Sequence, residues 1–260
     1  MTKRQKIIAA SLILSAGFLA IQFTQEGSFR YQAIAGLSLL ALLLSIISLR
    51  EGLDIKRRPA TLLTLVLPPL FTAGVGLFYF LLPASLLARL PVIIPFAVGI
   101  YALLLTANIY SVAAVRTIQL ARAAQAVGFI LTLVTAFLLF DTVWSFRFPA
   151  YFNAPLVGLI TFPLMLHALW SVQLEENISV SVWQISLVSS LCLAELALVL
   201  SFWPLSVVVA SLSLTTAIYA ILGLSQAKLT GRLFAKIVKE HLFFAGLFLL
   251  VVLATTSWKG

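Results

Sequence analysis

The strongest constraint on this 260-residue chain is a succession of nine long apolar segments separated only by short polar joints. A helix needs roughly 20 apolar residues to cross a hydrocarbon core about 30 Å thick, and each segment is close to that length. The sequence therefore predicts an all-α, polytopic integral membrane bundle with about nine transmembrane helices, eight being the alternative number. No joint is long enough for a soluble domain, so residues 1–260 are expected to form one membrane-embedded domain. The predicted spans are residues 7–23, 31–49, 62–82, 92–115, 123–144, 151–172, 180–201, 205–224 and 242–258.

The first span has a second interpretation as a signal peptide, because Lys3, Arg4 and Lys6 precede its apolar run. Cleavage after Ala20 would require a small residue at the position that Phe18 occupies. We therefore expect this segment to remain as the first membrane span.

Basic residues fall mainly on alternate joints, and this alternation predicts the orientation of the chain. Cytoplasmic joints of membrane proteins are enriched in Lys and Arg. An orientation with the N-terminus inside and the C-terminus outside leaves only four of the 17 basic residues on the outer side. The same pattern explains the net charge of +9 without nucleic-acid binding, because no joint is long enough to build a base-reading surface. The four outer residues are Arg30, Arg89, Arg147 and Lys259.

The joint at residues 226–241 carries an apolar stripe and a basic stripe. Leu229, Leu233 and Ile237 recur every four residues, and cations keep the same step beside them. This spacing predicts an amphipathic helix in the inner membrane interface, whose cations contact anionic headgroups of the lipid bilayer. A regulatory or partner-binding helix is the alternative. The cations of this joint are Lys228, Arg232, Lys236 and Lys239.

Polar residues inside the predicted spans mark a candidate site, because a charge near the bilayer centre is costly unless it is paired or hydrated. Glu195 lies roughly 10 Å below the outer end of its span, and Asp141 lies near the outer end of the fifth span. His167 and Asn108 occupy the inner halves of spans six and four, and Asn108 shares a helix face with Tyr101. Glu195, Asp141 and His167 together suggest a path for a proton or a cation.

The alternative is that the same groups hold helices together. A protonated Glu195 bonded to the hydroxyl of Ser189, Ser190 or Ser211 would serve that purpose. Helix contact is the favoured interpretation for Asp141, which lies close to water. It is also favoured for Asn108 and His167.

Two adjacent prolines interrupt the predicted third span. Pro68 and Pro69 fall near its middle, where each removes a backbone donor and favours a kink. Broken helices expose backbone carbonyls at membrane depth, and transporters use such groups to hold ions or substrate. The pair is therefore a candidate flexible break, although proline is also common in ordinary membrane helices.

The residues needed for several kinds of chemistry are missing from the sequence. One Cys and two His residues cannot supply the four nitrogen or sulfur ligands of a structural zinc site, and Cys192 is expected to be a buried apolar residue. Glu175 and Glu176 resemble the start of a prenyl-protein protease signature, but Val180 stands where that signature needs arginine. There is also no Gly-x-Ser-x-Gly elbow. We expect no catalytic residue, no metal and no cofactor.

Two short runs resemble polytopic proteins of small-genome bacteria. They are Arg116–Arg122, which leads into the fifth span, and Phe140–Trp144 near its outer end. The resemblance implies a multi-pass protein of the bacterial inner membrane. It implies no activity, so no functional residue follows from it.

Transport is the leading functional hypothesis from the sequence. A small-solute, lipid or ion transporter would use Glu195 for binding or coupling, Asp141 as an entry acid and the proline pair as its flexible break. The alternative is a non-catalytic membrane subunit or assembly protein, with a second copy or another membrane protein as partner. A membrane-embedded lipid-modifying enzyme is the third candidate. A hydrated cavity around Glu195 would favour the first, packed polar pairs the second, and polar groups gathered at headgroup level the third.

Overall fold

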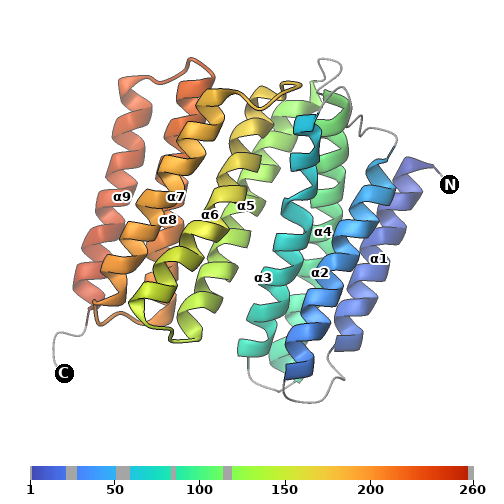
Figure 1. Cartoon of the computed structure of the whole chain (residues 1–260), viewed down its shortest axis with the longest axis horizontal. Helices are drawn as coiled ribbons and strands as arrows, with labels where there is room; N and C mark the ends of the chain where they lie inside the picture. Colours follow the sequence, from blue (N-terminus) through green and yellow to red (C-terminus); the bar gives the residue numbers. More distant parts are fainter. Residues whose placement is uncertain (1, 22–27, 51–58, 83–85, 114–118, 257–260) are drawn as a thin grey trace. The chain divides into compact units, whose positions relative to one another are not determined.

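The computed structural model describes residues 2–21, 28–50, 59–82, 86–113 and 119–256, with the backbone alone at residues 28 and 86–90. Within these ranges the chain is helical and has no strand, and nine helical segments are long and apolar enough to cross a membrane. The predicted all-α, multi-pass class is confirmed. The elements are α1 Lys3–Ile21, α2 Ser28–Leu49, η1 Pro59–Leu65, α3 Leu67–Leu81, α4 Leu86–Ala113, α5 Leu120–Ser145, α6 Ala150–Gln173, α7 Val180–Ser201, α8 Val207–Leu229 and α9 Ala235–Thr255 (Figure 1).

The helices follow the predicted spans in order, and most of their ends differ from the prediction by a few residues. α7 has the predicted bounds, whereas α4 begins at Leu86 rather than 92 and α9 at Ala235 rather than 242. Pro91 lies inside α4 without ending the helix. The first turns of α9 are helical but rich in charged residues. They therefore fell outside the predicted apolar span and inside the predicted amphipathic segment.

The chain divides into two compact units. The first comprises Met1–Thr135 and Leu174–Asn177, and the second comprises Ala136–Gln173 and Ile178–Gly260. The first unit therefore contains α1 to α4 and the start of α5, and the second contains the end of α5 and α6 to α9. The single domain predicted from the sequence stays a prediction.

An aromatic cluster forms the core of the first unit. The Phe18 ring of α1 stacks on Phe96 of α4 with centroids 4.6 Å apart, and it meets Tyr79 of α3 edge-on at 5.0 Å. Phe96 also stacks on Phe71 of α3, with centroids 6.0 Å apart. All four side chains are buried. Because lipid tails are as apolar as these rings, close packing holds the three helices together rather than removal of the rings from water.

The third span changes helix type partway across. η1 is a 3₁₀ helix, and α3 follows it with Pro68 and Pro69 in its first turn. The first N–H groups of an α-helix have no intrahelical acceptor, so prolines at this position remove no hydrogen bond. Near the junction, the hydroxyls of Thr64 and Thr72 donate to the carbonyls of Thr61 and Pro68 at 2.7 and 2.8 Å. A junction of two helix types thus takes the place of the kink inside one helix that the sequence suggests.

The predicted amphipathic helix over residues 226–241 is wrong as a continuous element. α8 runs to Leu229, and α9 begins only at Ala235. The cause is Gly231, whose φ of +67° lies in the left-handed region that residues with a side chain avoid. A glycine in this conformation just after the last helical residues is a common helix stop signal.

Two backbone hydrogen bonds fix the turn between α8 and α9. The N–H of Arg232 donates to the carbonyl of Ala227 at 2.8 Å, and the N–H of Gly231 donates to the carbonyl of Lys228 at 3.1 Å. This pair of bonds is the Schellman arrangement, which satisfies the last carbonyls of α8. α9 then packs beside α8 at the edge of its unit (Figure 1), and Val252 is its one buried residue.

Candidate functional site

A hollow of about 430 Å³ lies between α1 and α4 in the first unit. It is lined by two cations, two neutral polar side chains and two apolar side chains, so its surface is amphiphilic. The lining residues are Lys3, Arg4 and Ile7 of α1, and Tyr101, Leu105 and Asn108 of α4.

The first turn of α1 positions the two cations. Thr2 and Gln5 form a capping box, in which the Thr2 N–H donates to Gln5 Oε1 at 2.8 Å and the Gln5 N–H donates to Thr2 Oγ1 at 3.4 Å. Lys3 and Arg4 lie between them, the first half-buried and the second exposed. The first turn contains no acidic residue. Both cations therefore add to the positive end of the helix macrodipole, and this end of the hollow favours anions.

One face of α4 forms the opposite wall. Tyr101, Leu105 and Asn108 follow one another at steps of four and three residues, which places them on one face of the helix over about 10 Å. Tyr101 and Ile7 both pack with Leu104, deeper in the unit. Since α1 and α4 cross the membrane in opposite directions, Asn108 lies nearest the cations. The shared face predicted for Tyr101 and Asn108 is confirmed by their place in the same hollow.

The helix that carries this wall also packs on the broken third span. Leu65, the last residue of η1, forms a buried cluster with Leu49 of α2 and Ala107 of α4. Ala107 precedes Asn108 directly in the chain. The end of η1 therefore packs against α4 at the residue next to Asn108.

Asp141 lies in the second unit and bonds to a neighbouring helix. Its side chain is 5% exposed, and its Oδ1 accepts a hydrogen bond from Ser211 Oγ of α8 at 3.2 Å. Ser211 is one of the hydroxyls that the sequence offered to Glu195, and the structure gives it to Asp141 instead. The bond joins the end of α5 to the start of α8.

Glu195 lies on the exposed side of α7, and among the described residues it has no hydrogen-bond or ion-pair partner. It does not line the hollow between α1 and α4. Cys192, expected to be buried, is exposed on the same helix. The residue before Glu195 faces α6, because a Cβ added to Gly158 would lie 3.2 Å from Ala194 Cβ.

Other polar groups of the second unit join its helices. His167 is buried in α6, and the Gln226 side chain of α8 donates to the carbonyl of the next residue, Ala168, at 3.1 Å. Asn153 Nδ2 of α6 donates to Ser201 Oγ of α7 at 3.2 Å. Of the four candidate residues, Asn108 belongs to the first unit and Asp141, Glu195 and His167 to the second. The proton or cation path from Glu195 and Asp141 to His167 stays a prediction.

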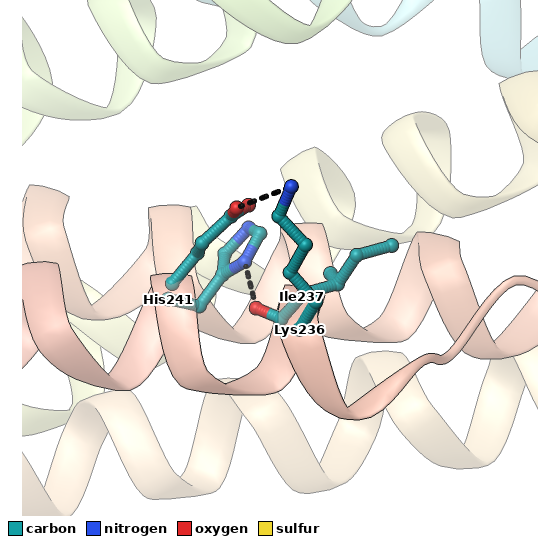
Figure 2. Close-up of polar contacts among 4 residues, drawn as sticks. Lys236, Ile237 and His241 are labelled. Atoms are coloured by element: carbon teal, nitrogen blue, oxygen red, sulfur yellow. Dashed lines mark hydrogen bonds and ion pairs between the residues drawn. The ribbon is translucent and has the colours of Figure 1, made fainter.

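The four basic residues of the 226–241 segment are all exposed, on the end of α8, the turn and the start of α9. Lys236 Nζ lies 4.0 Å from Glu240 Oε1. Figure 2 shows Lys236 on the first turns of α9 near His241, whose Nδ1 lies 2.9 Å from the carbonyl oxygen of Ile237. Lys259, residues 116–118 and the side chain of Arg89 lie outside the described residues.

The hollow between α1 and α4 is suited to binding. Its lining has no carboxylate, thiol or imidazole, and the described residues contain no group of three His, Cys, Asp or Glu side chains that could hold a metal. Lys3 and Arg4 were not predicted from the sequence as site residues, because their charge was used only to predict the orientation of the chain in the membrane. The Thr2–Gln5 spacing of a capping box is the signal that would have placed them on the first turn of a helix.

Comparisons with known proteins give a family and nothing closer. No curated protein and no solved structure matches the chain. The model of one family, described as "Protein of unknown function (DUF5656)", matches residues 7–255. The protein is a multi-pass membrane protein, and it belongs to this family.

Proposed function

We propose that this protein is a transporter of an anionic lipid or a similar anionic amphiphile, which it binds from the cytoplasmic side of the membrane in the hollow between α1 and α4. The single observation that carries the proposal is the lining of this hollow, in which two cations and Asn108 stand at one end and Ile7, Leu105 and Tyr101 continue from them. Such a surface matches a negatively charged headgroup followed by an apolar chain.

Depth and charge support this choice of ligand. The cations lie on the first turn of a membrane-spanning helix, at the level where lipid headgroups gather, and each contributes on the order of 1 kcal/mol to attraction for an anionic surface. Tyr101 lies about 10 Å further along the wall than Asn108, within the depth of the acyl chains. The positive charge of the inner joints supports a cytoplasmic position for this end of α1.

The broken third span is the proposed moving part. A 3₁₀ segment has poorer hydrogen-bond geometry than an α-helix, and stretches of it within longer helices often mark hinges. Leu65 at the end of η1 packs on Ala107, next to Asn108. A change at the junction before Pro68 would therefore be passed to the wall that holds the headgroup.

The proposal is tested by lipid exchange between the two leaflets of proteoliposomes. We expect the purified protein to speed the exchange of a fluorescent phosphatidylglycerol more than that of the matching phosphatidylcholine. Arg4→Gln/Asn108→Leu should reduce the phosphatidylglycerol rate about tenfold, because it removes one cation and one polar contact. Leakage of an entrapped dye checks that the vesicles stay sealed.

Two control variants make the result specific. Arg122→Gln removes an exposed cation from the start of α5, on the same predicted side, and Ile94→Trp adds bulk at a position of α4 that is 71% exposed and outside the hollow. Both should keep the parent rate, whereas Leu105→Trp, inside the hollow, should lower it. Equal rates for the site variant and the controls, or no protein-dependent exchange at all, would refute transport by this site.

A non-catalytic membrane subunit is the second candidate, and Glu195 is the observation that favours it. An exposed acid about 9 Å from the end of a membrane-spanning helix is costly in lipid and would be stabilised by a helix of another protein or of a second copy. The polar pairs of the second unit, which join its own helices, fit the same role. If the protein exchanges no lipid and Glu195→Gln abolishes a complex that the parent forms, this candidate replaces transport.

A further inference from the structure

We propose that the hairpin of α8 and α9 holds a second anionic phospholipid, independently of the hollow between α1 and α4. Its headgroup contacts the cations of the turn, and one acyl chain lies in a groove between the two helices. The groove and the turn belong to the second unit, so this site stands or falls separately from the proposed transport site.

The groove between α8 and α9 has the surface of an acyl-chain site. Its volume is about 410 Å³. The Thr216 hydroxyl already donates to the carbonyl of Leu212 at 2.9 Å, so it adds little polarity to a wall that is otherwise aliphatic and aromatic. The lining residues are Thr216 and Tyr219 of α8, and Phe244, Leu247, Phe248 and Val251 of α9.

The turn that joins the helices supplies the charge. Lys228, Arg232, Lys236 and Lys239 are exposed there, and Glu240 is the one acid of the same segment. Glu240 lies 4.0 Å from Lys236, with side chains 54% and 86% exposed, so this exposed ion pair is weak. Basic groups remain in excess, and the Schellman bonds of the turn hold their backbone in one conformation.

His241 lies between the cations and the groove and fixes the start of the hairpin. Its ring stacks on Tyr219 with centroids 5.1 Å apart and an interplanar angle of 17°. The ring also lies against Gly223, where any added side chain would collide with His241 Nε2. Its Nδ1 lies 2.9 Å from the Ile237 carbonyl (Figure 2). Tyr219 is therefore held at the end of the groove nearest the turn.

The dimensions of the hairpin match one leaflet. From Lys239 to Phe248 the helix rises about 14 Å, and one leaflet is about half of a 30 Å hydrocarbon core. A phospholipid with its phosphate among the cations would thus place an acyl chain along most of the groove. α9 packs on α8 at the edge of the unit, and almost all of its residues are exposed or half-buried, so the groove is open for a lipid to enter from the bilayer.

The experiment counts lipids that stay bound to the full-length protein in native mass spectrometry, with phosphatidylglycerol and phosphatidylcholine as probes. It uses an Arg4→Gln background, so that the other proposed site contributes little. Adding Arg232→Gln/Lys236→Gln should weaken phosphatidylglycerol binding about 25-fold, since each cation near the surface contributes about fivefold. Arg50→Gln/Arg122→Gln, which removes two exposed cations elsewhere, should change it less than twofold.

Groove-filling variants test the acyl chain. Leu247→Trp and Val251→Phe should each lower binding, whereas Leu250→Trp, at a position of α9 that is 64% exposed and outside the groove, should not. Inorganic phosphate serves as the competitor that distinguishes a lipid site from a bare phosphate site. We expect millimolar phosphate to leave the lipid bound. Displacement by phosphate, unchanged binding in both groove variants, or equal losses in the two charge variants would overturn the proposal.

Discussion

Replacing Phe18 by alanine is expected to lower the free energy of unfolding of the first unit by about 3 kcal/mol, because it leaves a cavity among rings that cannot collapse into it. Phe18 is 1% exposed and contacts rings of both α3 and α4. In lipid the loss is mainly of packing contacts, since the removed ring gains little from leaving an apolar solvent. Thermal unfolding in detergent micelles, followed by the fluorescence of an aggregation-sensitive dye, measures the change.

Phe29 provides the matched control for this substitution. It lies on α2 of the same unit and is 59% exposed, so Phe29→Ala removes the same atoms without opening a cavity. We expect its unfolding temperature to stay close to that of the parent protein. Equal losses for the two alanine variants would contradict the aromatic cluster as the core of this unit.

Gly128→Ala is expected to destabilise the protein by about 2 kcal/mol, although alanine is the better helix former, because it overpacks a closed contact. A Cβ at this position of α5 would collide with the Tyr110 hydroxyl of α4. The tyrosine is fully buried, and its hydroxyl donates to the carbonyl of Ala124 at 3.0 Å, so it has nowhere to move. The coupling between Gly128 and Tyr110 is measured from the unfolding temperatures of Gly128→Ala, Tyr110→Phe and the double variant.

The cycle is completed by Tyr110→Phe, which removes the oxygen that the new methyl group would strike. The next ring atom lies 3.4 Å from the added Cβ, an ordinary contact. Gly128→Ala should therefore cost little in the Tyr110→Phe background. Gly36→Ala on α2, where no atom lies within 4 Å of an added Cβ, should stabilise slightly. Additive effects of the two substitutions would contradict a direct contact between α4 and α5 at this position.

The membrane class and the order of the helices were predictable because a single physical requirement, the thickness of the hydrocarbon core, acts on every span. α7 was predicted to the residue because polar residues precede its apolar run and Pro204 follows it. α9 begins earlier than predicted because helix formation does not need apolar residues, only the absence of a stop signal.

Two features were not predicted from the sequence: the end of α8 at a glycine and the hydrogen bond between two distant residues. Gly231 lies in the middle of the predicted amphipathic helix, but the prediction rested on the regular spacing of leucines and cations and took no account of this glycine. The bond between Ser211 and Asp141 joins residues 70 positions apart, and no local pattern distinguishes it from a bond to Glu195. Which acid is buried depends on which face of each helix packs, and helices that are apolar all round carry little information about their inner face.

Site residues were predicted in part for the same reason. Asn108 and Tyr101 were placed on one face by spacing alone, and both line the hollow. Lys3 and Arg4 complete the lining of that hollow. They lie on α1, and no sequence pattern shows that α1 packs against α4. The predicted topology explains their charge, and that explanation concealed their place in the hollow.

The most direct test of the proposed lipid site is photolabelling of the full-length protein in vesicles with a phosphatidylglycerol that carries a diazirine near its headgroup. Mass spectrometry of the digested protein then locates the label. We expect label on α4 to concentrate around Asn108, at the headgroup end of the hollow, excess unlabelled phosphatidylglycerol to compete with it, and Arg4→Gln to reduce it about fivefold. Label spread evenly over exposed positions of α4 such as Ile94, with no competition and no effect of the variant, would contradict the site.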